Sequence, residues 1–187
     1  METNPRPGQE PSRLRLLERM PQSAVCAEIG VWKGDFSKSI LEITLPKRLH
    51  LIDPWTFQEE FPDRWYGGRR TNTQEDMDEI YQSVWSMFRD VSGVMIHQGF
   101  SENVLQEFED HYFDWLYIDG NHSYEYVLKD LELSFLKVKP GGIITGDDYN
   151  WGEKEGFPIR RAVHDFIEDH KLDHKLELLG SEFIIPL

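Results

Sequence analysis

Short apolar runs alternate with segments of helical periodicity along most of this chain, and this alternation constrains the fold more than any other feature of the sequence. Between the runs, apolar residues recur at helical spacing, for example in 36–43 and 124–135. Near-continuous apolar strands separated by helices are typical of a parallel sheet that is covered on both faces. The sequence therefore predicts an α/β fold with a doubly wound sheet. Five runs are expected to form its parallel strands: 24–31, 48–53, 93–99, 113–119 and 141–148.

The length of 187 residues favours a single domain, because domains average roughly 150 residues. We expect this domain to cover residues 11–187, and we expect residues 1–10, which are rich in Pro, Gly and polar side chains, to form a disordered tail. Residues 175–187 contain two short apolar segments around Gly180, which predicts a hairpin-like pair of C-terminal strands. The segment that opens the domain predicts a docking helix, with its apolar stripe at Leu14, Leu17 and Met20.

One stretch, residues 54–92, breaks the alternation. It is longer than an ordinary connection in an α/β unit, and loops of that length are usually functional or disordered. Its second part, 75–90, predicts a helix. Two compatible interpretations remain open, which are a small satellite core and a lid-like insertion over the ligand. Five aromatic residues argue against disorder: Trp55, Phe57, Phe61, Trp65 and Tyr66.

The charge balance excludes several kinds of partner. The chain has 34 acidic and 20 basic residues, which give a formal net charge of −14. This excess disfavours binding to nucleic acid and to anionic membrane surfaces, since both kinds of binding depend on Lys and Arg. No apolar run approaches the roughly 18–20 residues of a membrane helix, and the N-terminus lacks the apolar region of a signal peptide. The single cysteine, Cys26, cannot form an internal disulfide, which favours a cytoplasmic protein.

The ends of the first two predicted strands carry candidate ligand-binding residues, because ligands bind outside the carboxyl ends of strands in a doubly wound sheet. Glu28, Gly30 and Gly34 form the pattern E-x-G-x-x-x-G, in which glycine lets the backbone approach a ligand. A tight turn is the alternative. The G-x-G-x-x-G of dinucleotide sites is absent, which counts against a nicotinamide-linked oxidoreductase. Asp53 ends the second strand, where it either accepts ribose hydroxyls or caps a turn.

The fourth and fifth strands both end in carboxylates. Asp119 and His122 follow the fourth strand, and Asp147 and Asp148 follow the fifth. We expect these strands to be neighbours, so that the three carboxylates converge and require a compensating cation. Carboxylate oxygens suit Mg²⁺ or Mn²⁺, whereas a single nearby histidine and no nearby cysteine argue against structural zinc. The alternative is that Asp148 faces water and Asp147 caps a turn.

Taken in order, these motifs resemble the class I S-adenosylmethionine-dependent methyltransferases between about Ala24 and Tyr149. The most specific part is 114–149, which contains D-G-x-H and L-K-x-K-P-G-G-x-I-x-x-D-D. It looks like the metal-dependent small-molecule O-methyltransferases, particularly the sugar O-methyltransferases of macrolide and aminocoumarin biosynthesis, and less closely like the catechol and caffeoyl-CoA type. The resemblance implies a Rossmann-like methyltransferase sheet of seven strands, mostly parallel with an antiparallel C-terminal strand, and helices on both faces.

The resemblance also implies roles for individual residues. A divalent metal, Mg²⁺ or Mn²⁺, would be held by Asp119, Asp147 and Asp148. His122 would be the general base, and its alternative role is a helix-start residue that bonds the backbone. Ser101 is also expected to N-cap the helix that follows the third strand. The residues expected to contact S-adenosylmethionine are Glu28, Gly30, Gly34, Asp53, Phe100, Ser101 and Asp119.

The leading prediction for the function is therefore divalent-metal-assisted O-methylation of a small hydroxylated molecule. Two alternatives stay open, namely a metal-independent methyltransferase with another acceptor and a non-catalytic module that binds S-adenosylmethionine. The expected partner is the small-molecule acceptor, with no nucleic acid and no membrane. A homodimer is a further expectation, because the aromatic residues of 54–92 and the Leu-rich segment 12–20 are typical of interfaces.

Overall fold

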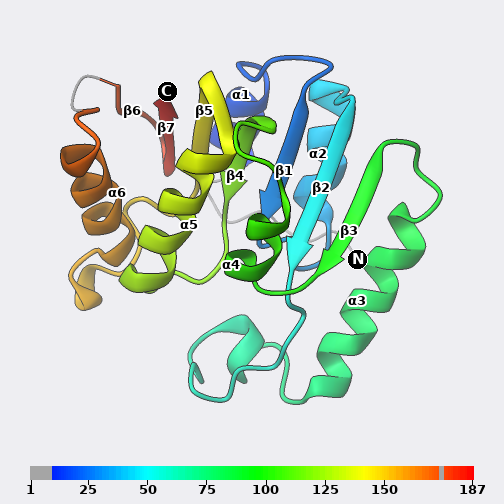
Figure 1. Cartoon of the computed structure of the whole chain (residues 1–187). Coiled ribbons are helices and arrows are strands. Elements are labelled where there is room, and N and C mark those ends of the chain that lie inside the picture. Colours follow the sequence, from blue (N-terminus) through cyan, green and yellow to red (C-terminus); the bar gives the residue numbers. More distant parts are fainter. Residues whose placement is uncertain (1–9, 173–174) are drawn as a thin grey trace.

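A seven-stranded sheet forms the centre of the computed structural model, which describes residues 10–172 and 175–187 (Figure 1). The strand order is β3-β2-β1-β4-β5-β7-β6. The first five of these strands are parallel, β7 runs antiparallel to β5, and β6 runs antiparallel to β7. This topology confirms the predicted mostly parallel sheet with an antiparallel C-terminal strand. The strands are β1 Val25–Ile29, β2 Arg48–Asp53, β3 Val94–Gln98, β4 Phe113–Ile118, β5 Val138–Gly146, β6 Glu177–Leu179 and β7 Glu182–Pro186.

Helices cover both faces of the sheet, as predicted. Alternate side chains of a strand point to opposite faces, so Trp115 and Tyr117 of β4 join one core cluster with α1, α2 and α3, while Leu116 and Ile118 join the other with α5 and α6. Within the described residues, no helix combines the length and the apolar character needed to cross a bilayer. The α-helices are α1 Glu10–Leu17, α2 Asp35–Thr44, α3 Gln74–Phe88, α4 Ser101–Val104, α5 Tyr124–Lys137 and α6 Pro158–Asp169. The 3₁₀ turns are η1 Trp65–Gly67, η2 Leu105–Glu107 and η3 Glu153–Glu155.

The predicted docking helix exists, but its buried face differs from the prediction. Helix α1 ends at Leu17, so Met20 reaches the core from the turn that follows the helix. Leu16 and Leu17 are buried, whereas Leu14 is 40% exposed. The predicted stripe is therefore wrong at Leu14, because the helix turns Leu16 rather than Leu14 into the core beside Leu17. The predicted disordered tail lies outside the described residues, apart from the first residue of α1.

The structure divides residues 54–92 into two parts with different positions. Residues 74–88 form α3, whose N-terminus has a capping box between Thr73 and Asp76 and which packs Val84 and Phe88 into the core. This helix is the ordinary crossover between β2 and β3. Residues 54–73 instead lie at the carboxyl ends of the strands, at the bottom of Figure 1. This first part is placed where a lid would have to be, and from α3 Met77 also lines the cavity described below.

The junction between α5 and β5 also differs from the prediction. The helix ends at Lys137, and β5 already begins at Val138, before the predicted start of this strand at residue 141. The pairing of β4 with β5 shifts register between Phe113 and Trp115. This irregularity accommodates Pro140 inside the strand, because a bulged strand tolerates a residue that cannot donate a backbone hydrogen bond.

Candidate active site

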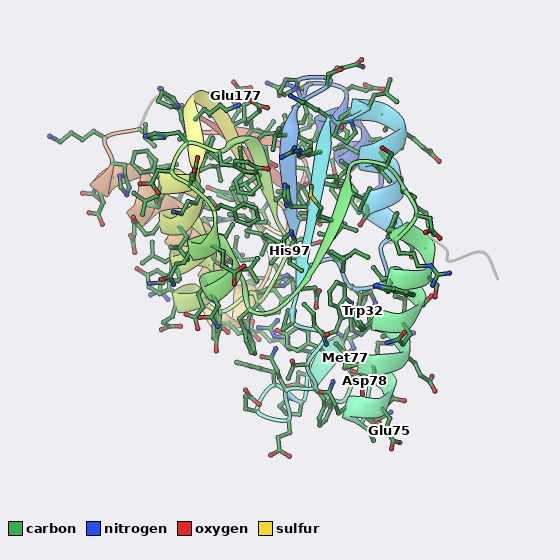
Figure 2. All side chains as sticks on the ribbon, turned by 45° about the vertical axis from the view of Figure 1, so that its right-hand side comes forward. Trp32, Glu75, Met77, Asp78, His97 and Glu177 are labelled. Atoms are coloured by element: carbon green, nitrogen blue, oxygen red, sulfur yellow. The ribbon has the colours of Figure 1, made fainter. Side chains whose placement is uncertain are left out.

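A cavity of about 730 Å³ opens at the carboxyl ends of β1, β2 and β4. This is the place where the strand order reverses and where ligands bind in open α/β sheets. Figure 2 labels two residues of its wall, Trp32 and Met77, at the end of the sheet opposite Glu177. Gly34 and Asp147 are not among the lining residues. The predicted site residues that do line the cavity are Glu28, Gly30, Asp53, Phe100, Ser101, Asp119, His122 and Asp148.

The two glycines after β1 have structural roles. Gly30 has φ 88°, and a Cβ atom there would lie 2.1 Å from the carbonyl oxygen of Asp119. Gly34 has φ 76° and precedes the first residue of α2, where a Cβ atom would lie 2.7 Å from the ring of Phe88. The close approach that Gly30 permits is therefore with the end of β4. It brings the carboxyl ends of β1 and β4 together at the cavity floor.

Glu28 is a buried acid in the wall of the cavity. Its carboxyl accepts a hydrogen bond from Ser37 Oγ at 2.5 Å. Burial raises the pKa of Glu28 from 4.5 to about 8, and the Ser37 hydrogen bond only partly opposes this effect. Burial thus favours the neutral acid, whose carboxyl can donate a hydrogen bond as well as accept one.

Replacing Glu28 with glutamine is expected to change how stability depends on pH. The pKa of Glu28 is raised in the folded protein, so the stability that the protonated acid contributes is fully present below its ordinary pKa of 4.5. This contribution is lost as the pH rises through about 8. Glutamine cannot ionise. Between about pH 6 and about pH 9, the free energy of unfolding of the wild type should fall by on the order of 2 kcal/mol more than that of Glu28→Gln. Urea unfolding measures this, and parallel falls in both proteins would contradict a buried neutral acid.

Asp53 organises the loops around the cavity. Its Oδ1 accepts from the backbone N–H of Trp55 at 2.7 Å, and its Oδ2 accepts from that of Trp32 at 2.9 Å. Both tryptophans have positive φ, at 43° and 53°. Burial raises the pKa of Asp53 although these backbone hydrogen bonds act in the opposite direction. Contact with ribose hydroxyls remains a prediction. The hydrogen bonds to Trp55 and Trp32 confirm the alternative that Asp53 caps a turn.

The side chain of Ser101 does not cap the helix as predicted. The N-cap residue of α4 is Phe100, and Ser101 is the first residue of the helix. Its Oγ donates to Asp130 Oδ1 at 2.5 Å. Asp130 is buried on α5 and lines the cavity, and burial raises its pKa to about 7. The sequence analysis missed Asp130, although an acid beside Val127 and Leu131 on the apolar face of the helix was an available signal.

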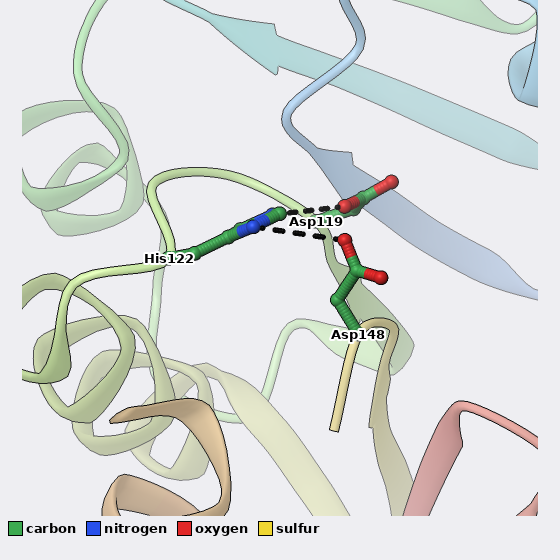
Figure 3. Close-up of side chains that lie close together, drawn as sticks. All are labelled: Asp119, His122 and Asp148. Atoms are coloured by element: carbon green, nitrogen blue, oxygen red, sulfur yellow. Dashed lines mark ion pairs between the residues drawn. The ribbon is translucent and has the colours of Figure 1, made fainter. Parts of the chain in front are cut away.

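Asp119, His122 and Asp148 form the cluster drawn in Figure 3. The Nε2 of His122 lies 3.4 Å from Asp119 Oδ1, and its Nδ1 lies 3.6 Å from Asp148 Oδ2. One donor atom from each residue lies within 4.8 Å of the others, an arrangement that could hold a metal ion. Asp119 follows β4 and Asp148 follows β5, so the convergence of two predicted carboxylates with the predicted base comes from neighbouring parallel strands.

The side chain of Asp147 does not join this cluster. It accepts hydrogen bonds from Arg13 Nη2, from Arg13 Nε at 2.9 Å and from Ser181 Oγ at 2.7 Å. Burial alone would raise the pKa of Asp147, but the Arg13 guanidinium and the Ser181 hydroxyl bring it below its ordinary value. Arg13 Nη2 also donates to Asp119 Oδ2 at 2.6 Å. The structure therefore does not unite all three predicted metal carboxylates, since the guanidinium of Arg13 binds Asp147 and one oxygen of Asp119.

Arg13 was not selected from the sequence, and no motif around it signals its role. It reaches the site because α1 is anchored beside the ends of β4 and β7. Ser12 Oγ and Tyr117 Oη both donate to the buried carboxyl of Glu182, at 3.3 and 3.0 Å. Burial raises the pKa of Glu182 to about 9. The anchor therefore places one guanidinium between Asp119 and Asp147.

Comparison with known proteins identifies the family. Residues 27–149 match the family described as "Methyltransferase domain". The uncharacterized protein R132 of Acanthamoeba polyphaga mimivirus is 33% identical over 70 residues, which cover 36% of this chain and 32% of the viral protein. The match thus spans about a third of that relative's length.

Three solved structures share the fold. The O-methyltransferase NovP has a TM-score of 0.66 and 18% identity, over 94% of this chain and 79% of NovP. A putative caffeoyl-CoA O-methyltransferase from Staphylococcus aureus has a TM-score of 0.58 and 14% identity, over 94% of this chain and 80% of its own. A putative rRNA-methylase from Clostridium thermocellum has a TM-score of 0.56 and 13% identity, over 97% of both chains.

At these low identities the three structures establish the fold and not the acceptor, which differs between them. The family match covers the first five strands and the cavity floor that they build. The chain therefore belongs to the methyltransferase-domain family.

Proposed function

We propose that this protein transfers the methyl group of S-adenosylmethionine to a hydroxyl oxygen of a small molecule, with the assistance of a divalent cation. The observation that carries the proposal is the cluster of Asp119, His122 and Asp148 in the wall of the cavity. It combines cation ligands with a proton acceptor at one end of a space large enough for cofactor and acceptor.

The donor set fits a hard divalent cation. Mg²⁺ usually binds through one or two carboxylates and completes its shell with water and substrate oxygens. Asp119 and Asp148 supply the two carboxylates, and their nearest oxygens lie 3.4 and 3.6 Å from the two nitrogens of the same imidazole. A bound cation would lower the pKa of a hydroxyl in contact with it. Asp147 is left out of the proposed set because it is bound by Arg13 and Ser181.

His122 is the proposed proton acceptor. Its ring nitrogens face Asp119 and Asp148, and its ring lies 5.3 Å from that of Trp151 in an edge-to-face arrangement. These contacts fix the orientation of the imidazole at the cavity wall. Histidine is a common general base near neutral pH. It would take the hydroxyl proton as the oxygen attacks the methyl group.

The other side of the cavity supports cofactor binding. Glu28, Asp53 and Asp130 are buried acids that line it beside Phe100 and Ser101. S-adenosylmethionine carries its methyl group on a positively charged sulfur, so the reaction mainly needs alignment of the methyl carbon with the nucleophile. We propose that these residues hold the cofactor, with its methyl group directed toward His122.

The similar structures support an oxygen acceptor without defining it. NovP and the Staphylococcus aureus protein are both named as O-methyltransferases. The Clostridium thermocellum protein is named as an rRNA-methylase, which makes RNA the alternative acceptor. The net charge of −14 opposes that alternative, because binding to a phosphate backbone needs clustered Lys and Arg.

Replacing His122 with glutamine is expected to lower kcat by about 10²- to 10⁴-fold. The rise of kcat/KM with pH should also be lost, because the variant has no imidazole to deprotonate, while calorimetry should show unchanged binding of S-adenosylhomocysteine. His170→Gln is the matched control, since His170 bonds Glu132 and is not among the residues that line the cavity. An unchanged pH profile in His122→Gln would contradict the proposed role.

A further inference from the structure

We propose that the acceptor carries a carboxylate and that Arg64 binds it. This inference rests on the proposed function and names the chemical class of its substrate. The half-buried Arg64 precedes η1, in the segment that covers the strand ends, and it lines the cavity. Its guanidinium carbon lies 3.9 Å from the centre of the Trp151 ring.

The position of Arg64 is defined relative to the proposed base. Trp151 contacts both residues, with its ring 5.3 Å from that of His122 and 3.9 Å from the Arg64 guanidinium. A small acceptor lying across Trp151 would therefore place one end at His122 and the other at Arg64. Tyr126, which is 41% exposed, lines the same cavity and offers a second aromatic wall.

The guanidinium of Arg64 can pair with a ligand. In the described part of the chain it makes neither an ion pair nor a side-chain hydrogen bond, whereas Arg13, which also lines the cavity, is paired with Asp119 and Asp147. Stacking on an indole leaves the N–H edges of a guanidinium free to pair with a carboxylate.

Two further buried donors lie in the cavity wall. Among residues 10–172 and 175–187, Tyr66 Oη and Asn121 Nδ2 have no hydrogen-bond partner, and both residues line the cavity. A buried polar atom without a partner costs free energy, so its donor is suited to an oxygen-rich ligand. Burial raises the pKa of Tyr66 to about 12, so its hydroxyl remains a donor at neutral pH. One half-buried guanidinium matches the single charge of a carboxylate better than the double charge of a phosphate ester.

The test measures binding of two probes that differ in one charge. The protein is saturated with S-adenosylhomocysteine and Mg²⁺ and titrated by calorimetry with 3,4-dihydroxybenzoate and with its neutral analogue 3,4-dihydroxybenzamide. We expect the benzoate to bind about 10- to 100-fold more tightly, as a charged hydrogen bond implies. Arg64→Met should remove this preference by weakening only the benzoate, and Arg64→Lys should restore part of it.

The matched control is Arg89→Met. Arg89 also stacks on an indole, with its guanidinium 4.5 Å from Trp85, but it pairs with Asp90 at the exposed end of α3 and does not line the cavity. This variant should keep the full preference for the benzoate. Equal affinities of the wild type for the two probes, or no binding of either, would overturn the inference. Equal methylation of both probes would overturn it while leaving the proposed function intact, and the absence of transfer to any acceptor would overturn the proposed function instead.

Discussion

Replacing Asp119 or Asp148 with asparagine is expected to lower kcat/KM by about 10³-fold and to weaken Mn²⁺ binding by about 100-fold. Asp147→Asn should leave the affinity for Mn²⁺ within a few-fold of the wild type. The reason is geometric, because Asp119 and Asp148 face His122 while Asp147 faces Arg13 and Ser181. Titration of each variant with Mn²⁺, followed by electron paramagnetic resonance, measures the affinity without an acceptor.

The same series tests the role of Arg13. Asp147→Asn should cost stability, by about 2–4 kcal/mol, because it leaves a largely buried guanidinium with one charged partner fewer. Asp90→Asn removes the same charge from an exposed position, where the side chain is 88% exposed, and should cost little. Equal losses of Mn²⁺ binding at Asp119, Asp147 and Asp148 would contradict this structure and favour a site of three carboxylates.

Gly30→Ala is expected to be the most destabilising small substitution in the site. The added Cβ atom would lie 2.1 Å from the carbonyl oxygen of Asp119, at a φ of 88° that side chains rarely adopt. The backbone would therefore have to move where the carboxyl ends of β1 and β4 lie side by side. The expected loss is about 4 kcal/mol or more, a large part of the stability of a typical domain.

Gly141→Ala is the matched control, because it has a similar positive φ to Gly30→Ala but no steric clash of the added Cβ atom. Gly141 has φ 81°, but a Cβ atom there meets nothing within 4 Å. Its expected cost is about 1 kcal/mol, from the left-handed conformation alone. Thermal unfolding of both variants measures the difference. A Gly30→Ala protein as stable as Gly141→Ala would mean that the ends of β1 and β4 are not packed as described.

The fold could be predicted because its signals are local. Each parallel strand is a short apolar run that must be buried on both faces, and the runs alone imply the strand–helix alternation. The helix at 74–88 was recognised by its period, but it was assigned to an insertion because no local signal tells a crossover helix from a lid. The strand ends could likewise be located, which is why Asp53, Asp119 and His122 could be placed at the edge of the sheet where the cavity lies.

What could not be predicted depends on side-chain direction and on distant partners. Asp147 and Asp148 are adjacent acids that appear equivalent in sequence, yet neighbouring residues after a strand point to different sides. The partner of Asp147 is Arg13, which lies 134 residues away in the chain. Arg64 and Trp151 are similarly distant in sequence, and only the three-dimensional structure brings them together beside His122.

The most direct test of the central claim is a transfer reaction followed by mass spectrometry. Metal-depleted protein is incubated with S-adenosylmethionine that carries a deuterated methyl group and with 3,4-dihydroxybenzoate, with Mg²⁺ or with a chelator. The proposed function predicts that the deuterated methyl group is found on a hydroxyl oxygen when Mg²⁺ is present and that the product is lost in the chelator. Equal product in the chelator would contradict the role of the cation, and a methyl group on nitrogen or carbon, or no transfer, would contradict O-methylation.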